Sequence, residues 1–356
     1  MDFWSEAAIF AEMKAAKKKG FFHNNQLALM IAGIALAMAV IFGAIFCLQT
    51  YGGEQVSLGF DGRGTNASLR DTLKARLGSA LGTKTYLLFK LQGGDAATLH
   101  GGYSVTSGQT AIRIARNLAK GYQTPVRVTF NNVRTLDQLA DRVTRNLEMT
   151  PADFMSACDS VLGSKGFTRE EYPAAFVPDS YDFYRDVSPR RLVERLFEYR
   201  NKFWNPARIA KATALGLDPA QVAAIASIVE EETAKSDERP KVARLYLNRL
   251  ARGMKLQADP TVKFALGDFS IRRLTQAMTR HASPYNTYYT DGLPPGPIRV
   301  ADKQTIDNVL DAPQHDYLYM CAREDFSGYH NFATDYATHQ ANARRYQAEL
   351  DRRGIR

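Results

Sequence analysis

Three consecutive glutamates, Glu230 to Glu232, end an apolar segment in the stretch ASIVEEETAKSDERPK. A buried carboxyl group has a raised pKa, because burial removes the water that stabilises its charge. Such a group keeps its proton near neutral pH and can protonate a leaving oxygen as a general acid. These three residues are therefore the first place in the chain where acid–base chemistry is expected.

Helical phase separates the three glutamates. At about 100° per residue, Glu232 continues the apolar face formed by Ile225 and Ile228. Glu230 lies at the edge of that face and Glu231 points away from it, so both are predicted to be ordinary surface acids. Glu232 is the candidate acid. Phase alone fits equally well a structural glutamate that is neutralised by an arginine or caps a neighbouring backbone.

The helix that must position these residues has a clear predicted start. Asp218 can cap it, Pro219 suits its first position, and Gln221 can close a capping box. We therefore expect one helix from residue 219 to the glutamates. An amphipathic basic helix is expected before it at 189–203, whereas the aromatic stretch FVPDSYDFY is predicted to be a packed loop.

Polar and aromatic segments follow the glutamates in the runs GMKLQADPTV and SPYNTYYTDGLPPGPI. Their prolines fix φ and predict a loop that holds its shape. Their amides, hydroxyls and aromatic faces suit sugar rings, although the same groups could build loops. The side chains that we expect to line a glycan groove are Gln257, Asp259, Thr261, Tyr285, Asn286 and Thr287.

The motifs SIVEEET, ERPKVARLYLNRL, GMKLQADPTV, SPYNTYYTDGLPPGPI and HNFATDYATHQ occur in this order. In this order they closely resemble those of the endolytic murein transglycosylases, the MltG or YceG-like family. The resemblance implies a membrane-anchored enzyme without a cofactor that cuts nascent peptidoglycan strands internally between MurNAc and GlcNAc. Such cleavage uses no water and leaves 1,6-anhydro-MurNAc ends, which would terminate glycan elongation. Peptidoglycan synthases are its implied partners.

The resemblance also assigns roles to the glutamates. The second glutamate of the family's SIVExET motif corresponds to Glu232, which is implied to act first as acid and then as base. Glu230 occupies the first glutamate of the motif and is the supporting residue, or the acid itself if helical phase misleads. One carboxyl group suffices because no water has to be activated, unlike in two-carboxylate glycosidases.

An uncharged apolar run covers residues 27–48 and is long enough to cross a membrane. It exceeds the apolar part of a cleaved signal peptide, and no Ala-x-Ala-like site closes it. Four lysines precede it, at positions 14, 17, 18 and 19. The positive-inside rule then predicts a single-pass inner (cytoplasmic) membrane protein whose residues 1–25 are cytoplasmic and whose remaining chain is extracytoplasmic.

We expect an α+β fold with a transmembrane helix at residues 26–48, a membrane-proximal domain at 49–150 and a mixed helix/sheet catalytic domain at 151–356. The stretch GYSVTSGQTAIRIARNLAKGYQTPVRVTF predicts strand, turn, helix and strand, and a second helix is expected at 135–146. On pattern alone this module is a spacer or a carbohydrate-binding unit. The family resemblance implies a LysM-like subdomain there.

The amino-acid composition limits the classes of protein to which the chain can belong. With 45% hydrophobic and 23% charged residues the chain is globular, and its formal charge of +9 favours anionic partners. No pattern typical of nucleic-acid binding or of a metal site is present. Cys158 and Cys321 could pair only if the fold brings them together. Two rival functions remain: a lysozyme-type hydrolase, with Asp259 as second carboxylate, and a non-catalytic peptidoglycan-binding scaffold.

Overall fold

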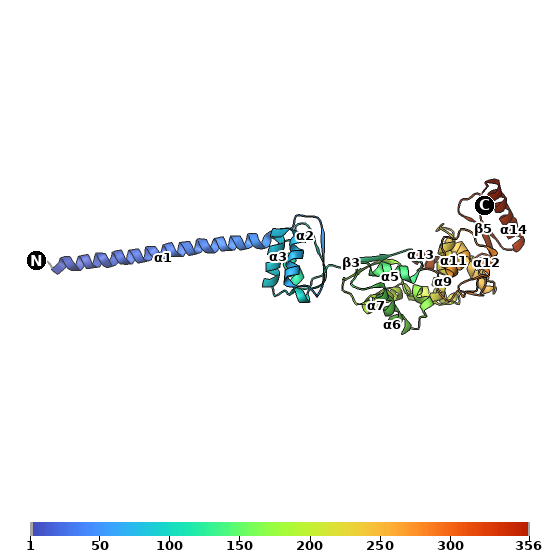
Figure 1. The fold of residues 1–356 in the computed structure, drawn as a ribbon, viewed down its shortest axis with the longest axis horizontal. Coiled ribbons are helices and arrows are strands. Elements are labelled where there is room, and N and C mark those ends of the chain that lie inside the picture. The colour runs from blue at the N-terminus through green and yellow to red at the C-terminus, as the bar shows by residue number, and fades with distance from the viewer. Residues whose placement is uncertain (1–2, 355–356) are drawn as a thin grey trace. The chain divides into compact units, whose positions relative to one another are not determined.

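The computed structural model describes residues 3–354, and the side chains of residues 11–14 and 26–354. The chain has a mixed α and β fold. Its contacts divide it into two compact units, Met1–Thr124 and Pro125–Arg356, each with its own hydrophobic core (Figure 1).

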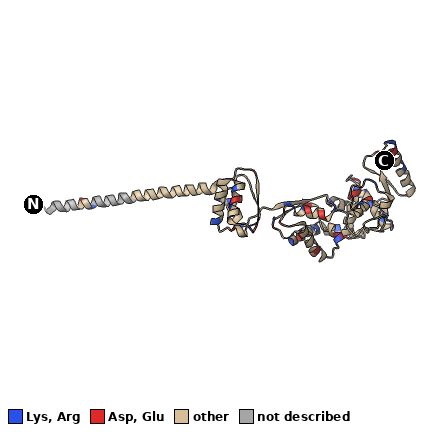
Figure 2. Cartoon of the chain, in the orientation of Figure 1, with Lys and Arg blue, Asp and Glu red and all other residues tan. Residues whose placement is uncertain are grey.

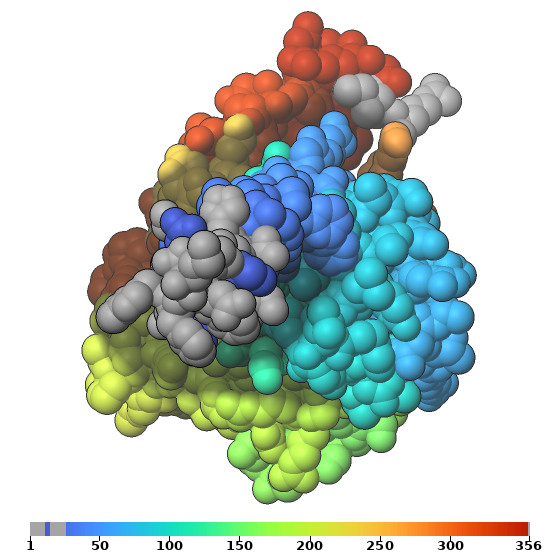
Figure 3. Space-filling model, turned by 90° about the vertical axis from the view of Figure 1, so that its left-hand side faces the viewer, coloured from blue at the N-terminus to red at the C-terminus, as the bar shows by residue number. Residues whose placement is uncertain are grey.

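The first unit begins with a long N-terminal helix. Antiparallel strands β1 and β2 pair from Val56 with Val105 to Asp61 with His100, and α2 packs against α3. Figure 3 draws the described atoms of this unit in blue to cyan. Leu73, Phe89 and Ile114 are among its most buried side chains. The elements of this unit are α1 (Phe3–Leu48), β1 (Val56–Asp61), α2 (Asn66–Leu77), α3 (Ser79–Leu91), η1 (Ala96–Thr98), β2 (His100–Val105) and α4 (Ala111–Ala119).

The second half of α1 is long and apolar enough to cross a membrane. Gln26–Leu48 is 23 residues long, and it is drawn without charged residues in Figure 2. Leu29 and Phe42 are 72% and 70% exposed, so the protein itself does not cover this surface. A signal sequence has the same properties. Most side chains of the predicted cytoplasmic tail, residues 1–25, lie outside the described residues.

The second unit carries the three glutamates and packs around two hydrophobic clusters. One cluster is centred on α5, α6 and α7, and the other on α9, α10 and α13 (Figure 1). The elements are β3 (Val126–Phe130), α5 (Leu136–Thr144), α6 (Pro151–Gly163), η2 (Arg169–Ala175), β4 (Asp179–Phe183), α7 (Pro189–Phe203), α8 (Pro206–Ala214), α9 (Pro219–Glu232), α10 (Arg239–Ala251), α11 (Asp259–Leu266), α12 (Gln276–Thr279), α13 (Lys303–Leu310), β5 (Tyr319–Ala322), β6 (His330–Ala333) and α14 (Tyr336–Arg352).

The stretch FVPDSYDFY is a strand, so the predicted loop is wrong. Residues 179–183 pair antiparallel with β3, from Val126 with Phe183 to Phe130 with Asp179. Tyr181 stacks on Phe130 with ring centroids 5.5 Å apart. Because β3 and α5 pack with α6 and β4, the structure divides after Thr124, whereas the sequence placed the division after residue 150.

Helix α9 begins as its sequence predicts. The Asp218 side chain accepts hydrogen bonds from the backbone of Ala220 and Gln221, and the Gln221 side chain accepts one from the Asp218 backbone N–H. Unlike a surface helix, α9 is buried on all sides, since every residue from 222 to 229 is buried. It packs against η2, α8, α10, α11 and α13. Its C-terminal end is therefore enclosed by several segments.

Candidate active site

Glu232 is the last residue of α9, and it is partly exposed, although one oxygen of its carboxyl group is enclosed. Its Oε2 is enclosed and makes no hydrogen bond with any residue that the structure describes. Burial, followed by the negative charge of Asp259, raises the pKa of Glu232 to about 7. The positive charge of His330, a hydrogen bond from Tyr246 and the charge of Lys263 act in the opposite direction. Glu232 is thus held close to its protonation midpoint at neutral pH.

His330 forms an ion pair beside this glutamate. Its Nδ1 lies 2.7 Å from Oε2 of Glu238, and its backbone N–H donates to the other oxygen of Glu238 at 2.8 Å. Thr233, next to Glu232, donates to Glu238 as well. Burial lowers the pKa of His330, but the hydrogen bond and charge of Glu238 outweigh it and raise that pKa above its ordinary value. The protonated form of His330 is therefore favoured, and its charge acts on Glu232.

Glu230 and Glu231 are not the surface acids that helical phase predicted. Both carboxylates pair with Arg299, at 3.0 and 2.6 Å, and the Arg299 side chain is only 6% exposed. Glu231 also accepts two hydrogen bonds of 3.0 Å from Arg134, and Glu230 accepts one from the Asp302 backbone. The phase argument assumed one buried face, whereas α9 is enclosed all round. The three glutamates thus differ in their partners rather than in their exposure.

The proline-rich loop is fastened to the middle of α9. Ser227 Oγ accepts the backbone N–H of Ile298 at 3.0 Å and donates to Ala224 at 2.7 Å. Gly296 passes so close to the chain that an added Cβ would lie 1.9 Å from the carbonyl oxygen of Glu170. The motif therefore fixes the loop to the helix that carries Glu232.

Two of the predicted groove residues face solvent. Gln257 and Asp259 are exposed. The buried Arg249 donates to the amide oxygen of Gln257 at 2.6 Å, and Tyr288 donates to Asp259 at 2.6 Å. Gln257 adopts a positive φ of 53°, which is uncommon for a residue other than glycine. The structure brings Asp259 close enough to Glu232 for its charge to act on it.

Three other predicted contacts lie beneath the surface, which corrects their expected direct access to sugar. Thr261, Asn286 and Thr287 are fully buried. The hydroxyls of Thr261 and Thr287 lie 2.8 Å apart, and Thr287 also accepts the backbone N–H of Ala258. Asn286 donates to the carbonyls of Thr279 and His281. Tyr285 is half-buried and lies 4.7 Å from Phe264, ring centroid to centroid.

The described residues contain neither a candidate metal-binding cluster nor a disulfide bond. They contain no group of three or more His, Cys, Asp or Glu that could hold a metal ion. Cys158 and Cys321 are both free thiols, the first in a hydrophobic cluster and the second on β5.

Comparison with known proteins assigns the chain to a family. The sequence model of the YceG-like family matches residues 64–345, which covers about half of the first unit and nearly all of the second. The chain belongs to the YceG-like family. The match confirms the family that the five motifs indicated.

Relatives of this YceG-like protein include two curated proteins named endolytic murein transglycosylase. One, from Bacillus subtilis, is 41% identical over 101 residues, which are 28% of this chain and 28% of the relative. The other, from Streptococcus pneumoniae serotype 2, is 28% identical over 149 residues, which are 41% of this chain and 27% of the relative. The chain thus matches little more than a quarter of the length of these relatives.

A solved structure shares the fold. The crystal structure of a yceG-like protein from Listeria monocytogenes matches with a TM-score of 0.54. The match covers 81% of this chain and 98% of that chain, at 22% identity.

Sequence reasoning missed several residues of this YceG-like site. The sequence patterns do not single out His330, Tyr246, Tyr288 or Glu238, although each acts on Glu232 or on a partner of it. The one feature of the sequence that could have indicated Glu238 and His330 as site residues is their position within motifs of the family. Their meeting beside Glu232 depends on how β6 and α10 pack, which no local pattern contains.

Proposed function

We propose that this YceG-like protein is a lytic transglycosylase that cuts within peptidoglycan glycan strands. The observation that carries the proposal is the carboxyl group of Glu232 at the end of a buried helix, with one oxygen enclosed and its pKa raised to about 7. The relatives named endolytic murein transglycosylase support the same activity. A single group that can hold and release a proton near neutral pH is what a non-hydrolytic cleavage needs.

Glu232 would act twice in one turnover. As an acid it protonates the glycosidic oxygen between MurNAc and GlcNAc, and the bond from the MurNAc anomeric carbon to that oxygen breaks. As a carboxylate it then takes the proton of the MurNAc 6-hydroxyl while that oxygen bonds to the anomeric carbon. The product is a 1,6-anhydro end, no water is consumed, and Glu232 is protonated again.

The surrounding residues support this role in two ways. The exposed Gln257 and Asp259 and the half-buried Tyr285 are the proposed glycan contacts. Thr261, Asn286 and Thr287 would shape the loops from beneath. Glu230 is the proposed supporting residue, because it ties the end of α9 to Arg299 and to the start of α13.

We also propose a location and a domain arrangement. Helix α1 would anchor the protein once in the inner membrane, with residues 1–25 in the cytoplasm and the remainder outside it. Of the predicted membrane-proximal domain, 49–150, residues 49–124 would form a domain with a LysM-like part, supported by the strand and helix of β2 and α4. Residues 125–150 would join the predicted catalytic domain, 151–356. Peptidoglycan synthases are the proposed partners because they produce nascent strands.

A hydrolase is the second candidate, and the charge of Asp259 acting on Glu232 favours it. Hydrolysis requires a second carboxylate roughly 5–9 Å from the acid. Product masses decide between the two reactions. Full-length protein in detergent is mixed with uncrosslinked strands, and the lyase predicts anhydro-ended fragments. Fragments heavier by one water would establish the hydrolase, and intact but bound strands would favour the non-catalytic scaffold.

A further inference from the structure

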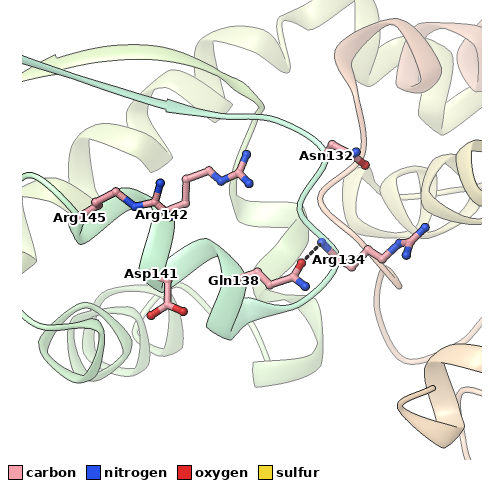
Figure 4. A pocket seen from close by; sticks show the side chains of 6 residues that line it. All are labelled: Asn132, Arg134, Gln138, Asp141, Arg142 and Arg145. Carbon is pink, nitrogen blue, oxygen red and sulfur yellow. Dashed lines mark hydrogen bonds between the residues drawn. The ribbon is translucent and has the colours of Figure 1, made fainter. Parts of the chain in front are cut away.

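A basic pocket opens beside the catalytic helix. It has a volume of about 410 Å³ and lies over α5 and the loop that precedes it (Figure 4). Three of its residues are arginines and one is an acid. The lining residues are Asn132, Arg134, Gln138, Asp141, Arg142 and Arg145.

The guanidinium groups of Arg142 and Arg145 are available to bind an anion. Both side chains are exposed, and neither forms an ion pair with a carboxylate that the structure describes. Arg142 donates only to the carbonyl and side-chain oxygens of Asn131, at 3.2 and 3.4 Å. In Figure 4 the Asp141 carboxylate points away from both guanidinium groups. Two guanidinium groups without a carboxylate partner suit a carboxylate or phosphate oxyanion, which each can bind through two N–H groups.

The pocket is connected to the proposed acid. Arg134 lines it and donates both hydrogen bonds to Glu231, the residue before Glu232. Gln138, on the first turn of α5, accepts the backbone N–H of Arg134 at 3.0 Å. From Gln138 to Arg145 the lining continues along one side of α5 for about 10 Å, at 1.5 Å per residue. An anion held by Arg142 and Arg145 would therefore lie on a part of the substrate that is removed along α5 from the bond that is cut.

We propose that Arg142 and Arg145 form a subsite for an oxyanion carried by the glycan substrate. This inference rests on the proposed function. The sugar rings of such strands are uncharged. Their oxyanions are the carboxylates of the peptides attached to muramic acid and the diphosphate of a lipid-linked end. Both present the same chemistry to a guanidinium group, and the subsite would make the enzyme prefer strands that carry one of them at this position along the strand.

The test compares three substrates with full-length protein in detergent at low salt. They are peptide-bearing strands without lipid, the same strands with their carboxylates amidated, and amidated strands that end in a lipid diphosphate. Wild type is expected to show a KM about five- to tenfold lower for the strands that carry the preferred anion. In Arg142→Gln/Arg145→Gln the ratio of the KM for strands without the preferred anion to the KM for strands with it should fall towards one. In Arg142→Lys/Arg145→Lys this ratio should lie between those of the wild type and the glutamine variant. The charged substrate that shows the preference identifies the anion.

Two controls keep the outcome decisive. Arg190→Gln/Arg195→Gln removes the same charge from the exposed side of α7 and should keep the wild-type ratio. Equilibrium binding of the same three substrates is measured alongside cleavage. Equal preferences in wild type and Arg142→Gln/Arg145→Gln, in cleavage or in binding, would overturn the subsite. Absence of cleavage with wild type, together with a charge preference in binding that the double variant loses, would contradict the proposed function and support the subsite.

Discussion

Nη1 of Arg299 lies 2.6 Å from Oε1 of Glu231, in an ion pair whose arginine is almost fully buried. The same guanidinium group contacts Glu230. Arg299 and Arg134 together therefore neutralise two acids of the motif. The third, Glu232, has no hydrogen-bond partner for its Oε2 among the described residues. Of the three glutamates, Glu232 is therefore the one whose surroundings favour a protonated carboxyl group.

Arg299→Gln should destabilise the second unit strongly. It leaves the carboxylates of Glu230 and Glu231 buried with less compensating charge, and breaking a buried pair costs about 3–5 kcal/mol. Urea unfolding followed by tryptophan fluorescence measures it, since Trp204 lies in the same hydrophobic cluster as α9. The control is Arg190→Gln, whose exposed pair with Glu194 is worth at most about 0.5 kcal/mol. Equal losses in the two variants would contradict the structural role of Arg299.

Glu232→Gln should change the pH dependence of stability. Between the ordinary pKa of 4.5 and the folded value of about 7, the folded protein holds a proton that the unfolded chain has released. The wild-type free energy of unfolding therefore falls as pH rises through this window and levels off above it, by at most about 3 kcal/mol. Glutamine does not titrate, so the variant should gain stability relative to wild type from pH 5 to pH 8. A difference that is the same at both pH values would argue against the raised pKa.

His330→Gln should move the alkaline limb of activity to higher pH. The positive charge of His330 lowers the pKa of Glu232, against burial and the charge of Asp259, which raise it. Without that charge Glu232 should keep its proton to a higher pH, so kcat/KM should begin to fall later. The pH profile of kcat/KM measures this, with the exposed His281→Gln as control. An unmoved limb, or one displaced to lower pH, would contradict the assignment.

Gly296→Ala should destabilise the loop that is fastened to α9. The new methyl group would lie 1.9 Å from a backbone oxygen, so the loop or η2 must shift, at about 1–3 kcal/mol. Gly163→Ala is the matched control, because the nearest atom to its added methyl group is 4.0 Å away. Thermal unfolding should separate the two variants. Similar melting temperatures would mean that the contact between Gly296 and the backbone of Glu170 can relax without loss of stability.

The comparison of sequence and structure shows where local patterns suffice. The caps of α9 and the bounds of α7 follow from residues that are neighbours in sequence, and they were predicted. Glu232 was singled out by phase, yet the same phase misjudged Glu230 and Glu231. Phase describes one helix, whereas burial is decided by the segments that surround it.

The predicted groove failed in part for the same kind of reason. Thr261 and Thr287 have the composition expected of sugar contacts, but their hydroxyls bond to each other inside the protein. The strand at 179–183 was missed because its partner, β3, lies far away in the sequence. His330 reaches Glu232 only through the packing of β6. Such relationships arise from tertiary contacts and could not be derived from spacing.

The most direct measurement of the central claim is a digest of uncrosslinked strands by full-length wild type and by Glu232→Gln, with the products identified by mass. The substitution keeps the shape of the side chain and removes its titratable proton. We expect anhydro-ended fragments from the wild type and none from a Glu232→Gln variant that is folded and binds strands. Anhydro-ended fragments from that variant at the wild-type rate would contradict the role of Glu232 as the acid and base of this enzyme.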